Sequence, residues 1–139
     1  MRAVLDPNIL IAALLSRSGT PAQIISRWLA GDLELIVSDA LLDELERALA
    51  YPKLQRRISA QEAHEFVALL RASAVLAPDA EAPPRSADPG DDYLIALAES
   101  THAILVTGDQ HLLALAARLP IQGASQFLRM IEVGREAAE

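Results

Sequence analysis

The chain has 139 residues and a formal net charge of −7, with 52% hydrophobic residues, 22% charged residues and no cysteine. These values fit one folded domain over residues 1–139, and they argue against a disordered chain, a disulfide framework, a zinc–thiolate site and a cysteine nucleophile. No apolar run approaches the ~20 residues that span a bilayer, so we expect a cytoplasmic protein that does not enter a membrane.

The first half of the chain alternates strand and helix patterns. Residues 2–5 form a short β-compatible run, and an apolar segment over 8–15 predicts a buried first helix. Thr20 and Pro21 predict the start of a second helix that stops at Gly31, because threonine caps helices and proline fits their first position. The next predicted elements are a strand over 33–37, a helix capped at Ser38 and ended by Pro52, and an amphipathic helix over 59–73.

The second half begins with a weak strand and a long loop. The loop over 77–90 contains four prolines, which exclude regular structure there, and loops of this length are often functional. The elements predicted around this loop are a strand over 74–77, a helix over 90–100, the strongest strand over 103–107, a short helix over 110–118, an edge strand over 120–122 and a final helix capped by Ser125. Strands that alternate with helices predict an α/β fold, with a parallel sheet covered on both faces.

Two acids follow predicted strands. Asp6 comes directly after the strand over 2–5, and Asp109 comes soon after the strand over 103–107. The carboxyl ends of parallel strands share one crevice in open α/β sheets, so we expect both side chains at the same rim. Each acid also has a purely structural interpretation as a helix N-cap.

Helical geometry selects two further acids. Within 39–50, Glu44 falls at the edge of the apolar stripe, whereas the other charged residues of that helix point away. Within 90–100, Asp91 falls in the middle of the buried face and Asp92 lies roughly a quarter turn away, so Asp92 is an auxiliary candidate at most. A solvated Glu44, and an Asp91 that only complements the helix dipole, are the structural alternatives.

The chemistry of four convergent acids follows from their repulsion. Two carboxylates about 4 Å apart repel by ~4 kcal/mol at an effective dielectric of ~20, so four of them either share protons or bind a cation. With no thiolate and no well-placed histidine pair, an all-oxygen site favours Mg²⁺ or Mn²⁺. Such ions on carboxylates are the usual apparatus of phosphodiester cleavage, and they would let an acidic protein receive a phosphate.

Three segments resemble the motifs of a known family. VLDPNILIAAL, SDALLDELERALAYPKL and ADPGDDYLIALAESTHAILVTGDQHLL are similar to the motifs of the PIN-domain family, in its toxin-like branch of VapC type. The resemblance implies a three-layer fold with a five-stranded parallel sheet of order 3-2-1-4-5. It places the family's acids at Asp6, Glu44, Asp91 and Asp109, the same four that geometry selects.

The resemblance also implies an activity and its partners. The family members are Mg²⁺- or Mn²⁺-dependent ribonucleases, and many bacterial ones are toxins that a co-transcribed antitoxin keeps silent and that are commonly homodimers. One departure is Pro7, because the family usually has Thr or Ser there and this chain lacks that hydroxyl near the first acid. Asn8 matches the family's asparagine, which helps to hold the site. Thr107 either bonds to a site carboxylate in partial compensation or is an ordinary threonine at a strand end.

Other residues and functions are less well supported. The three histidines are scattered and predicted at the surface, Arg17 and Arg85 are predicted as solvated loop cations, and Trp28 and Phe66 as core or interface residues. A phospho-acceptor receiver domain needs a lysine after a late strand, whereas the only lysine, Lys53, follows a mid-chain helix. A PIN fold that has lost cleavage and serves as an interaction module is the main alternative, and Pro7 is the feature that keeps it open.

Overall fold

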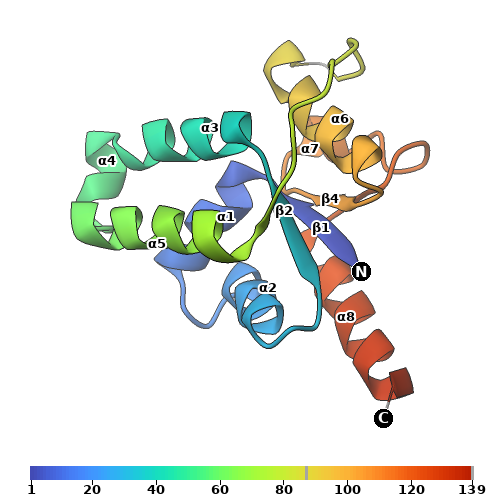
Figure 1. The fold of residues 1–139 in the computed structure, drawn as a ribbon, viewed down its shortest axis with the longest axis horizontal. Coiled ribbons are helices and arrows are strands. Elements are labelled where there is room, and N and C mark those ends of the chain that lie inside the picture. The colour runs from blue at the N-terminus through green and yellow to red at the C-terminus, as the bar shows by residue number, and fades with distance from the viewer. Residues whose placement is uncertain (87, 139) are drawn as a thin grey trace.

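Residues 1–86 and 88–138 are described by a computed structural model (Figure 1). Five parallel strands form one sheet in the order β3-β2-β1-β4-β5, which confirms the predicted topology. The strands are β1 Arg2–Leu5, β2 Glu34–Val37, β3 Val75–Leu76, β4 Ile104–Val106 and β5 Ile121–Gln122. The α-helices are α1 Pro7–Leu15, α2 Thr20–Leu29, α3 Asp39–Leu49, α4 Pro52–Gln55, α5 Ala60–Ser73, α6 Asp92–Ser100, α7 Gln110–Leu113 and α8 Ala124–Ala138, and a 3₁₀ turn, η1, covers Pro89–Asp91.

The sheet is covered by helices on both faces, as predicted. In Figure 1, α1, α2, α3 and α5 lie on one side of the sheet and α6 lies on the other. The central strand β1 pairs with both β2 and β4, with Ala3 opposite Leu35 on one side and Ile104 on the other. Its residues Ala3–Leu5 are fully buried, as expected for a parallel strand that has helices above and below it. The carboxyl ends of β1 and β4 therefore meet at one edge of the sheet.

Two helix starts are set by serine caps that the sequence predicts. The Ser38 hydroxyl accepts from the Leu41 backbone N–H at 3.2 Å, and the Ser59 hydroxyl accepts from the Glu62 N–H at 3.1 Å. These caps fix the starts of α3 and α5, which run antiparallel to each other on the same side of the sheet (Figure 1). The residues that follow Ser38 along α3 include Glu44, so this cap sets where that acid lies.

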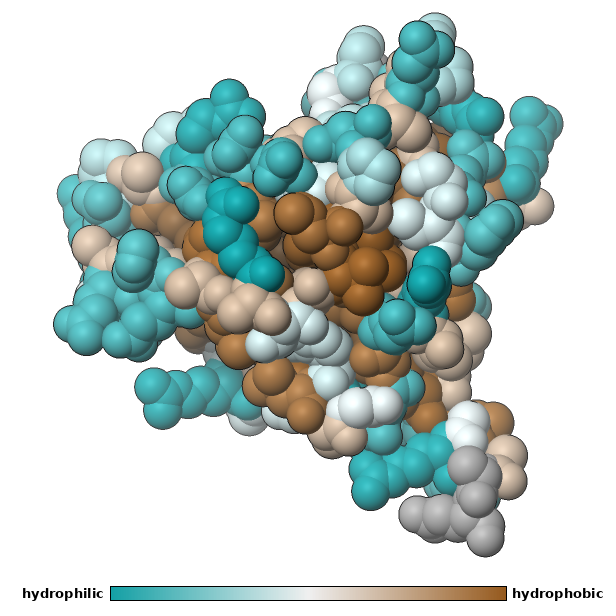
Figure 2. Space-filling model, in the orientation of Figure 1, coloured by the Kyte–Doolittle hydropathy of each residue, from teal (hydrophilic) through white to brown (hydrophobic). Residues whose placement is uncertain are grey.

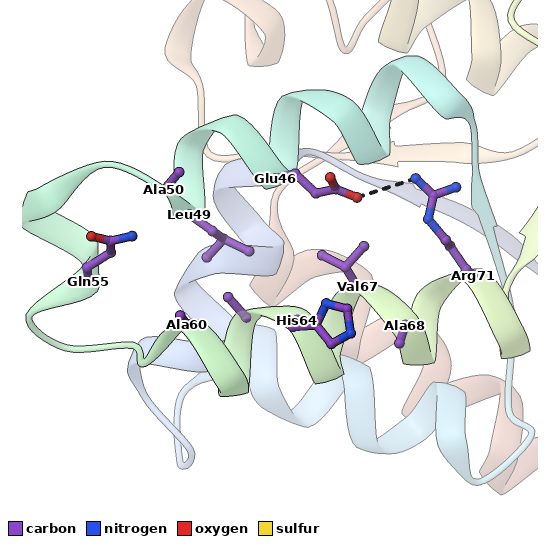
Figure 3. A pocket seen from close by; sticks show the side chains of 10 residues that line it. Glu46, Leu49, Ala50, Gln55, Ala60, His64, Val67, Ala68 and Arg71 are labelled. Atoms are coloured by element: carbon purple, nitrogen blue, oxygen red, sulfur yellow. Dashed lines mark hydrogen bonds and ion pairs between the residues drawn. The ribbon is translucent and has the colours of Figure 1, made fainter.

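Between α3 and α5 lies a groove of about 380 Å³, with α4 at one end (Figure 3). Leu49 and Val67 line it, and an ion pair crosses it from Arg71 to Glu46 at 3.3 Å. Arg71 also lies 3.7 Å from Asp39, at the start of α3. The two helices and the short helix between them therefore form one connected hairpin.

Several predicted helix ends are wrong by one or more residues. Helix α2 is capped by Gly19 rather than Thr20, and Pro52 begins α4 instead of ending α3, which ends at Leu49. Helix α8 already begins at Ala124, so Ser125 lies inside it and is not the cap. Proline and small polar residues fit several positions in the first turn of a helix. These residue types therefore indicate that a helix starts nearby, but they do not fix its first residue.

The helix predicted over 110–118 is only one turn long. Helix α7 ends at Leu113, and the following backbone amides of Leu115 and Ala116 bond to carbonyls three residues back rather than four. The chain must turn here to reach the edge strand β5, so tertiary structure overrides the helix propensity of this alanine-rich segment. Within the part of the chain that is described, no single helix is long and apolar enough to cross a membrane; α1 and α2 meet that test only as a pair bent by 98°.

Candidate active site

The ends of β1 and β4 hold two buried side chains that are hydrogen-bonded to each other, and a backbone amide completes the group. Asp6 is only 5% exposed and Thr107 is fully buried. The Thr107 hydroxyl donates to Asp6 Oδ2 at 2.8 Å and accepts from the Asp109 backbone N–H at 3.0 Å. Thr107 thus does bond to a predicted site carboxylate, which decides between the two interpretations of this residue that the sequence leaves open.

Asp6 is also held from its own helix. Its Oδ1 accepts from the Asn8 backbone N–H at 3.0 Å, so Asp6 is the N-cap of α1 with Pro7 at the first helical position. Burial raises the pKa of Asp6, while the hydrogen bonds from Asn8 and Thr107 oppose that rise and nearby Asp109 adds to it. Both the structural and the chemical interpretations of Asp6 therefore apply, since the cap leaves this carboxylate buried and next to another acid.

Asp109 caps α7 with the same geometry. Its Oδ1 accepts from the backbone amides of His111 at 2.7 Å and Leu112 at 3.3 Å. The side chain is half-buried, and it stands beside Asp6 because Thr107 joins the two residues. The two strand-end acids therefore lie at one rim, as the sheet topology predicts.

Glu44 reaches the same region from α3. It is half-buried, whereas Asp43, Glu46 and Arg47 are exposed, which confirms the predicted orientation of this helix. The hydroxyl of Tyr93 on α6 donates a hydrogen bond to Glu44 Oε2. Burial and this hydrogen bond both raise the pKa of Tyr93, so the phenol stays protonated and remains a donor. Tyr93 therefore links α3 to α6 across the candidate site.

Asp91 shows most directly that the acids share one region. Burial, together with the negative charges of Asp88, Asp6, Asp109 and Glu44, raises the pKa of Asp91 to about 6. Burial is the largest cause of this rise, and the four acids contribute to it because like charges near a carboxylate disfavour its ionised form. Acids from distant parts of the sequence, Asp6, Glu44 and Asp109, thus act on Asp91.

The predicted burial of Asp91 and Asp92 is wrong in its order. Asp91 is half-buried, whereas Asp92 is only 4% exposed. The reason is the 3₁₀ turn η1, which rotates Asp91 relative to the regular helix that the sequence predicts from residue 90 onward. The side chain that this turn directs toward the other acids is nevertheless that of Asp91.

Asp92 holds the preceding loop instead of joining the acids. Its Oδ1 accepts from the Ser86 hydroxyl at 2.7 Å and from the backbone amides of Ser86 at 2.9 Å and Arg85 at 3.2 Å. The hydrogen bond from Ser86 lowers the pKa of Asp92 despite its burial. Asp92 therefore stays ionised and anchors the segment that leads to Asp91, and its auxiliary role at the site stays a prediction.

The remaining sequence candidates lie where they were expected to lie or are accounted for by packing. All three histidines are exposed, Arg17 is exposed, and Arg85 is ion-paired with Glu99. Trp28 and Phe66 belong to the core. The side chain of Asn8 is exposed, and it is the backbone N–H of Asn8 that donates a hydrogen bond to Asp6.

Sequence reasoning missed Tyr93 as a site residue. Its hydroxyl contacts a glutamate 49 positions away, so no local pattern connects the two residues. Its position two residues after Asp91, on the helix that also carries that acid, is the only signal that could have suggested it.

The oxygen atoms gathered here suit a hard divalent ion as ligands, although the acids as they stand do not form a complete metal site. Among residues 1–86 and 88–138, no three His, Cys, Asp or Glu side chains stand close enough together to hold a metal as they are. All the donors gathered here are carboxylate or hydroxyl oxygens, which are the ligands of Mg²⁺ and Mn²⁺. The rise in the pKa values of Asp6 and Asp91 marks a place where positive charge would be stabilising.

The family assignment agrees with this geometry. The PIN domain family profile matches residues 2–111, a stretch that contains all four acids. The chain belongs to the PIN domain family. No curated protein matches the sequence. The resemblance to the family's motifs is therefore confirmed for the part of the chain that the profile covers.

Solved structures share this PIN fold at low sequence identity. PAE2754 from Pyrobaculum aerophilum is 20% identical, with a TM-score of 0.65 and 96% of each chain covered. VapBC-1 from nontypeable Haemophilus influenzae is 19% identical, with a TM-score of 0.61, 90% of this chain and 99% of that chain. VapBC2 from Rickettsia felis, bound to a DNA fragment from its promoter, is 13% identical, with a TM-score of 0.60, 88% of this chain and 98% of that chain.

Proposed function

We propose that this PIN domain is a metal-dependent endoribonuclease and the toxin of a toxin–antitoxin pair. The observation that carries the nuclease proposal is the placement of Asp6 and Asp109 at the adjoining ends of β1 and β4, where the buried Thr107 hydroxyl joins them. Burial and the charges of Asp88, Asp6, Asp109 and Glu44 raise the pKa of Asp91 beside them. Carboxyl groups whose pKa is raised by burial and by neighbouring acids, as those of Asp6 and Asp91 are, are typical of catalytic centres.

Each residue has a distinct part in this proposal. Asp6 and Asp109 would hold Mg²⁺ or Mn²⁺ from the strand ends, and Glu44 and Asp91 would complete its ligands from the helices. A divalent ion bound there activates water and stabilises the charge that develops on the phosphate. Thr107 keeps Asp6 oriented through a buried hydrogen bond, and Tyr93 does the same for Glu44.

Pro7 does not by itself remove the polar support of the first acid. The hydroxyl that the family usually has after this acid is missing, but the Thr107 hydroxyl lies 2.8 Å from Asp6 Oδ2. The interaction-module alternative rests on Pro7, so this contact favours the nuclease over it. An interaction module would fold and bind its partner, but it would not gain stability from Mn²⁺.

The toxin proposal rests on the motifs of the VapC type and on the neighbours. Two of the structures that share this fold are VapBC proteins, and we infer from them a cognate antitoxin partner for this chain. A small neighbouring gene that encodes a DNA-binding protein is expected, and co-expression of its product should relieve the growth arrest that this chain causes. The family resemblance also predicts a homodimer, which light scattering of the purified protein measures.

The decisive experiment is cleavage of an unstructured RNA by the purified protein with Mn²⁺ or Mg²⁺. We expect cleavage that EDTA abolishes, and a loss of at least about 100-fold in Asp6→Asn and Asp91→Asn, because each removes a carboxylate that the ion needs. Asp43→Asn is the matched control, since Asp43 is exposed and points away from Glu44. DNA of the same sequence should remain intact. Full activity of Asp6→Asn and Asp91→Asn would overturn the proposal.

A further inference from the structure

One end of the molecule is rich in positive charge, although the protein as a whole is acidic. Residues 47–61 contain four of the twelve Lys and Arg residues and none of the nineteen Asp and Glu residues. The four are Arg47, Lys53, Arg56 and Arg57, and all of them are exposed. We call these four residues the basic tip.

The cations of the basic tip are not used to stabilise the fold. Within the described residues, five other arginines form ion pairs: Arg2, Arg27, Arg71, Arg85 and Arg135. None of the four tip residues has an acidic partner in that part of the chain. The charges of the basic tip are therefore available to a ligand.

The backbone that carries the basic tip is fixed by the core. Ile58 is only 1% exposed and Leu54 is half-buried against the core, so the short segment around α4 is anchored at two points. Pro52 starts α4, and backbone hydrogen bonds from Leu54 and Gln55 return to Tyr51. The tip is the end of the α3–α4–α5 hairpin in Figure 1, and Figure 2 shows mainly hydrophilic residues over it.

The tip is placed at a useful distance from the candidate active site. Helix α3 carries both Glu44 and Arg47 and ends at Leu49, just before the rest of the tip, and the five residues from Glu44 to Leu49 correspond to ~7.5 Å at 1.5 Å per residue. Tyr51 is 64% exposed among the tip cations, although aromatic residues are scarce in this chain. A nucleic-acid strand whose phosphate lies among the four acids would reach the tip within a few nucleotides.

We propose that the basic tip binds phosphates of single-stranded RNA on one side of the cleaved bond. This inference rests on the proposed ribonuclease function and extends it. A metal ion among the acids attracts only the nearest phosphate, since charges are screened beyond ~8 Å at physiological salt. The next phosphates meet an acidic protein unless other cations hold them, and the guanidinium groups of the tip suit phosphate oxygens.

The test measures RNA binding by a cleavage-deficient protein as a function of salt. In an Asp91→Asn background, the triple variant Lys53→Gln, Arg56→Gln, Arg57→Gln is compared with Arg17→Gln, Arg118→Gln, Arg129→Gln. Arg17, Arg118 and Arg129 are equally exposed, carry the same total charge and form no ion pair among the described residues. Affinity for a labelled unstructured 20-nucleotide RNA is read by fluorescence anisotropy.

We expect the tip variant to bind about tenfold more weakly at low salt. The slope of log affinity against log salt should fall by about 2, because each phosphate contact to a single strand contributes ~0.7. The control variant should keep the slope of the parent protein. Equal slopes and affinities in the two variants would overturn the proposal. A tip variant that binds RNA like its parent but no longer binds a polyglutamate peptide would also overturn it, because the tip would then recognise an acidic protein segment rather than RNA.

Cleavage kinetics distinguish failure of this inference from failure of the proposed function. With Asp91 intact, the tip variant should show a KM about tenfold higher on the long RNA and an unchanged kcat. On a dinucleotide substrate, whose single phosphate would lie among the four acids, both constants should match those of the control variant. If the parent protein does not cleave RNA, the proposed function fails; if it cleaves and the tip variant has an unchanged KM on long RNA, only the tip proposal fails.

Discussion

The acids that follow the strands are held by two hydrogen bonds each, whereas those on the helix side of the site are held by one or none. Asp6 accepts from Asn8 and Thr107, and Asp109 accepts from two amides of α7. Glu44 accepts from Tyr93 alone, and among the described residues no hydrogen bond to the side chain of Asp91 is found. Half of the candidate site is therefore fixed by the sheet, and half depends on helices that approach it.

This difference teaches how a site can be both precise and adjustable. The strand-end acids cannot move without breaking caps and a buried contact, so in the proposed function they would set the position of a bound ion. Asp91 lies in a 3₁₀ turn and feels the charge of the other acids, so its side chain would be the one to respond to a cation. The described residues do not form a complete metal site. A change in the position of the Asp91 side chain would complete it from the helix side.

The largest effect is expected on the fixed half. Thr107→Val keeps the shape but removes the hydroxyl that donates to buried Asp6 and accepts from Asp109. A buried carboxylate that loses a hydrogen bond costs ~1–3 kcal/mol, so unfolding in urea should show a stability loss of about 2 kcal/mol and a weaker response to Mn²⁺. Thr101→Val is the control, because the Thr101 hydroxyl bonds, among the described residues, to carbonyls of α6 and to no acid. Equal stability and an equal response to Mn²⁺ in the two variants would show that the Thr107 hydroxyl supports neither the fold nor the site.

A smaller effect is expected at the adjustable half, and it depends on pH. The pKa of Asp91 is raised to about 6 in the folded protein, so ionisation of Asp91 lowers the free energy of unfolding. The contribution of this group is therefore most favourable below pH 4 and is lost as the pH rises through 6. Without metal, Asp91→Asn should be more stable than the parent at pH 8 by roughly 1 kcal/mol, less than the full shift implies because Asp91 is partly exposed. Below pH 4 the gain should vanish. A constant difference between pH 4 and pH 8, measured by urea unfolding beside Asp43→Asn, would contradict this account.

The link between the two helices should matter least. Tyr93→Phe removes the hydroxyl that donates to Glu44 and leaves the ring in place. We expect metal affinity measured by titration calorimetry to fall about three- to tenfold, because a residue that orients a ligand contributes less than the ligand itself. Tyr51→Phe is the matched control, since Tyr51 is exposed and its hydroxyl contacts none of the four acids among the described residues. An unchanged affinity in Tyr93→Phe would mean that Glu44 needs no such support.

The sheet and its rim could be predicted from sequence because both depend on local patterns. The run over 2–5 predicted β1 with its bounds, and the acids after β1 and β4 follow from parallel pairing alone. Helical periodicity also placed Glu44 correctly, since α3 is a regular helix with a serine cap. The position and orientation of these elements depend on local sequence patterns, so the sequence alone is enough to predict them.

The parts that sequence could not supply depend on distant contacts or on small changes of backbone geometry. A 3₁₀ turn exchanged the burial of Asp91 and Asp92, and a periodicity of 100° per residue cannot anticipate such a turn. The bond from Tyr93 to Glu44 joins two helices, and the hold of Asp92 on Ser86 organises a proline-rich loop. The shortened α7 reflects the path to β5 rather than the preference of its own residues.

The most direct test of the account is the thermal midpoint of the protein with and without Mn²⁺ at pH 7.5. A ligand that binds only the folded state raises the midpoint, and about a hundredfold excess over Kd adds ~2.7 kcal/mol. For a chain of this size we predict a rise of about 5 °C or more for the parent protein, and none for Asp6→Asn. No rise in the parent, or the same rise in both proteins, would contradict the claim that these four carboxylates form one cation site.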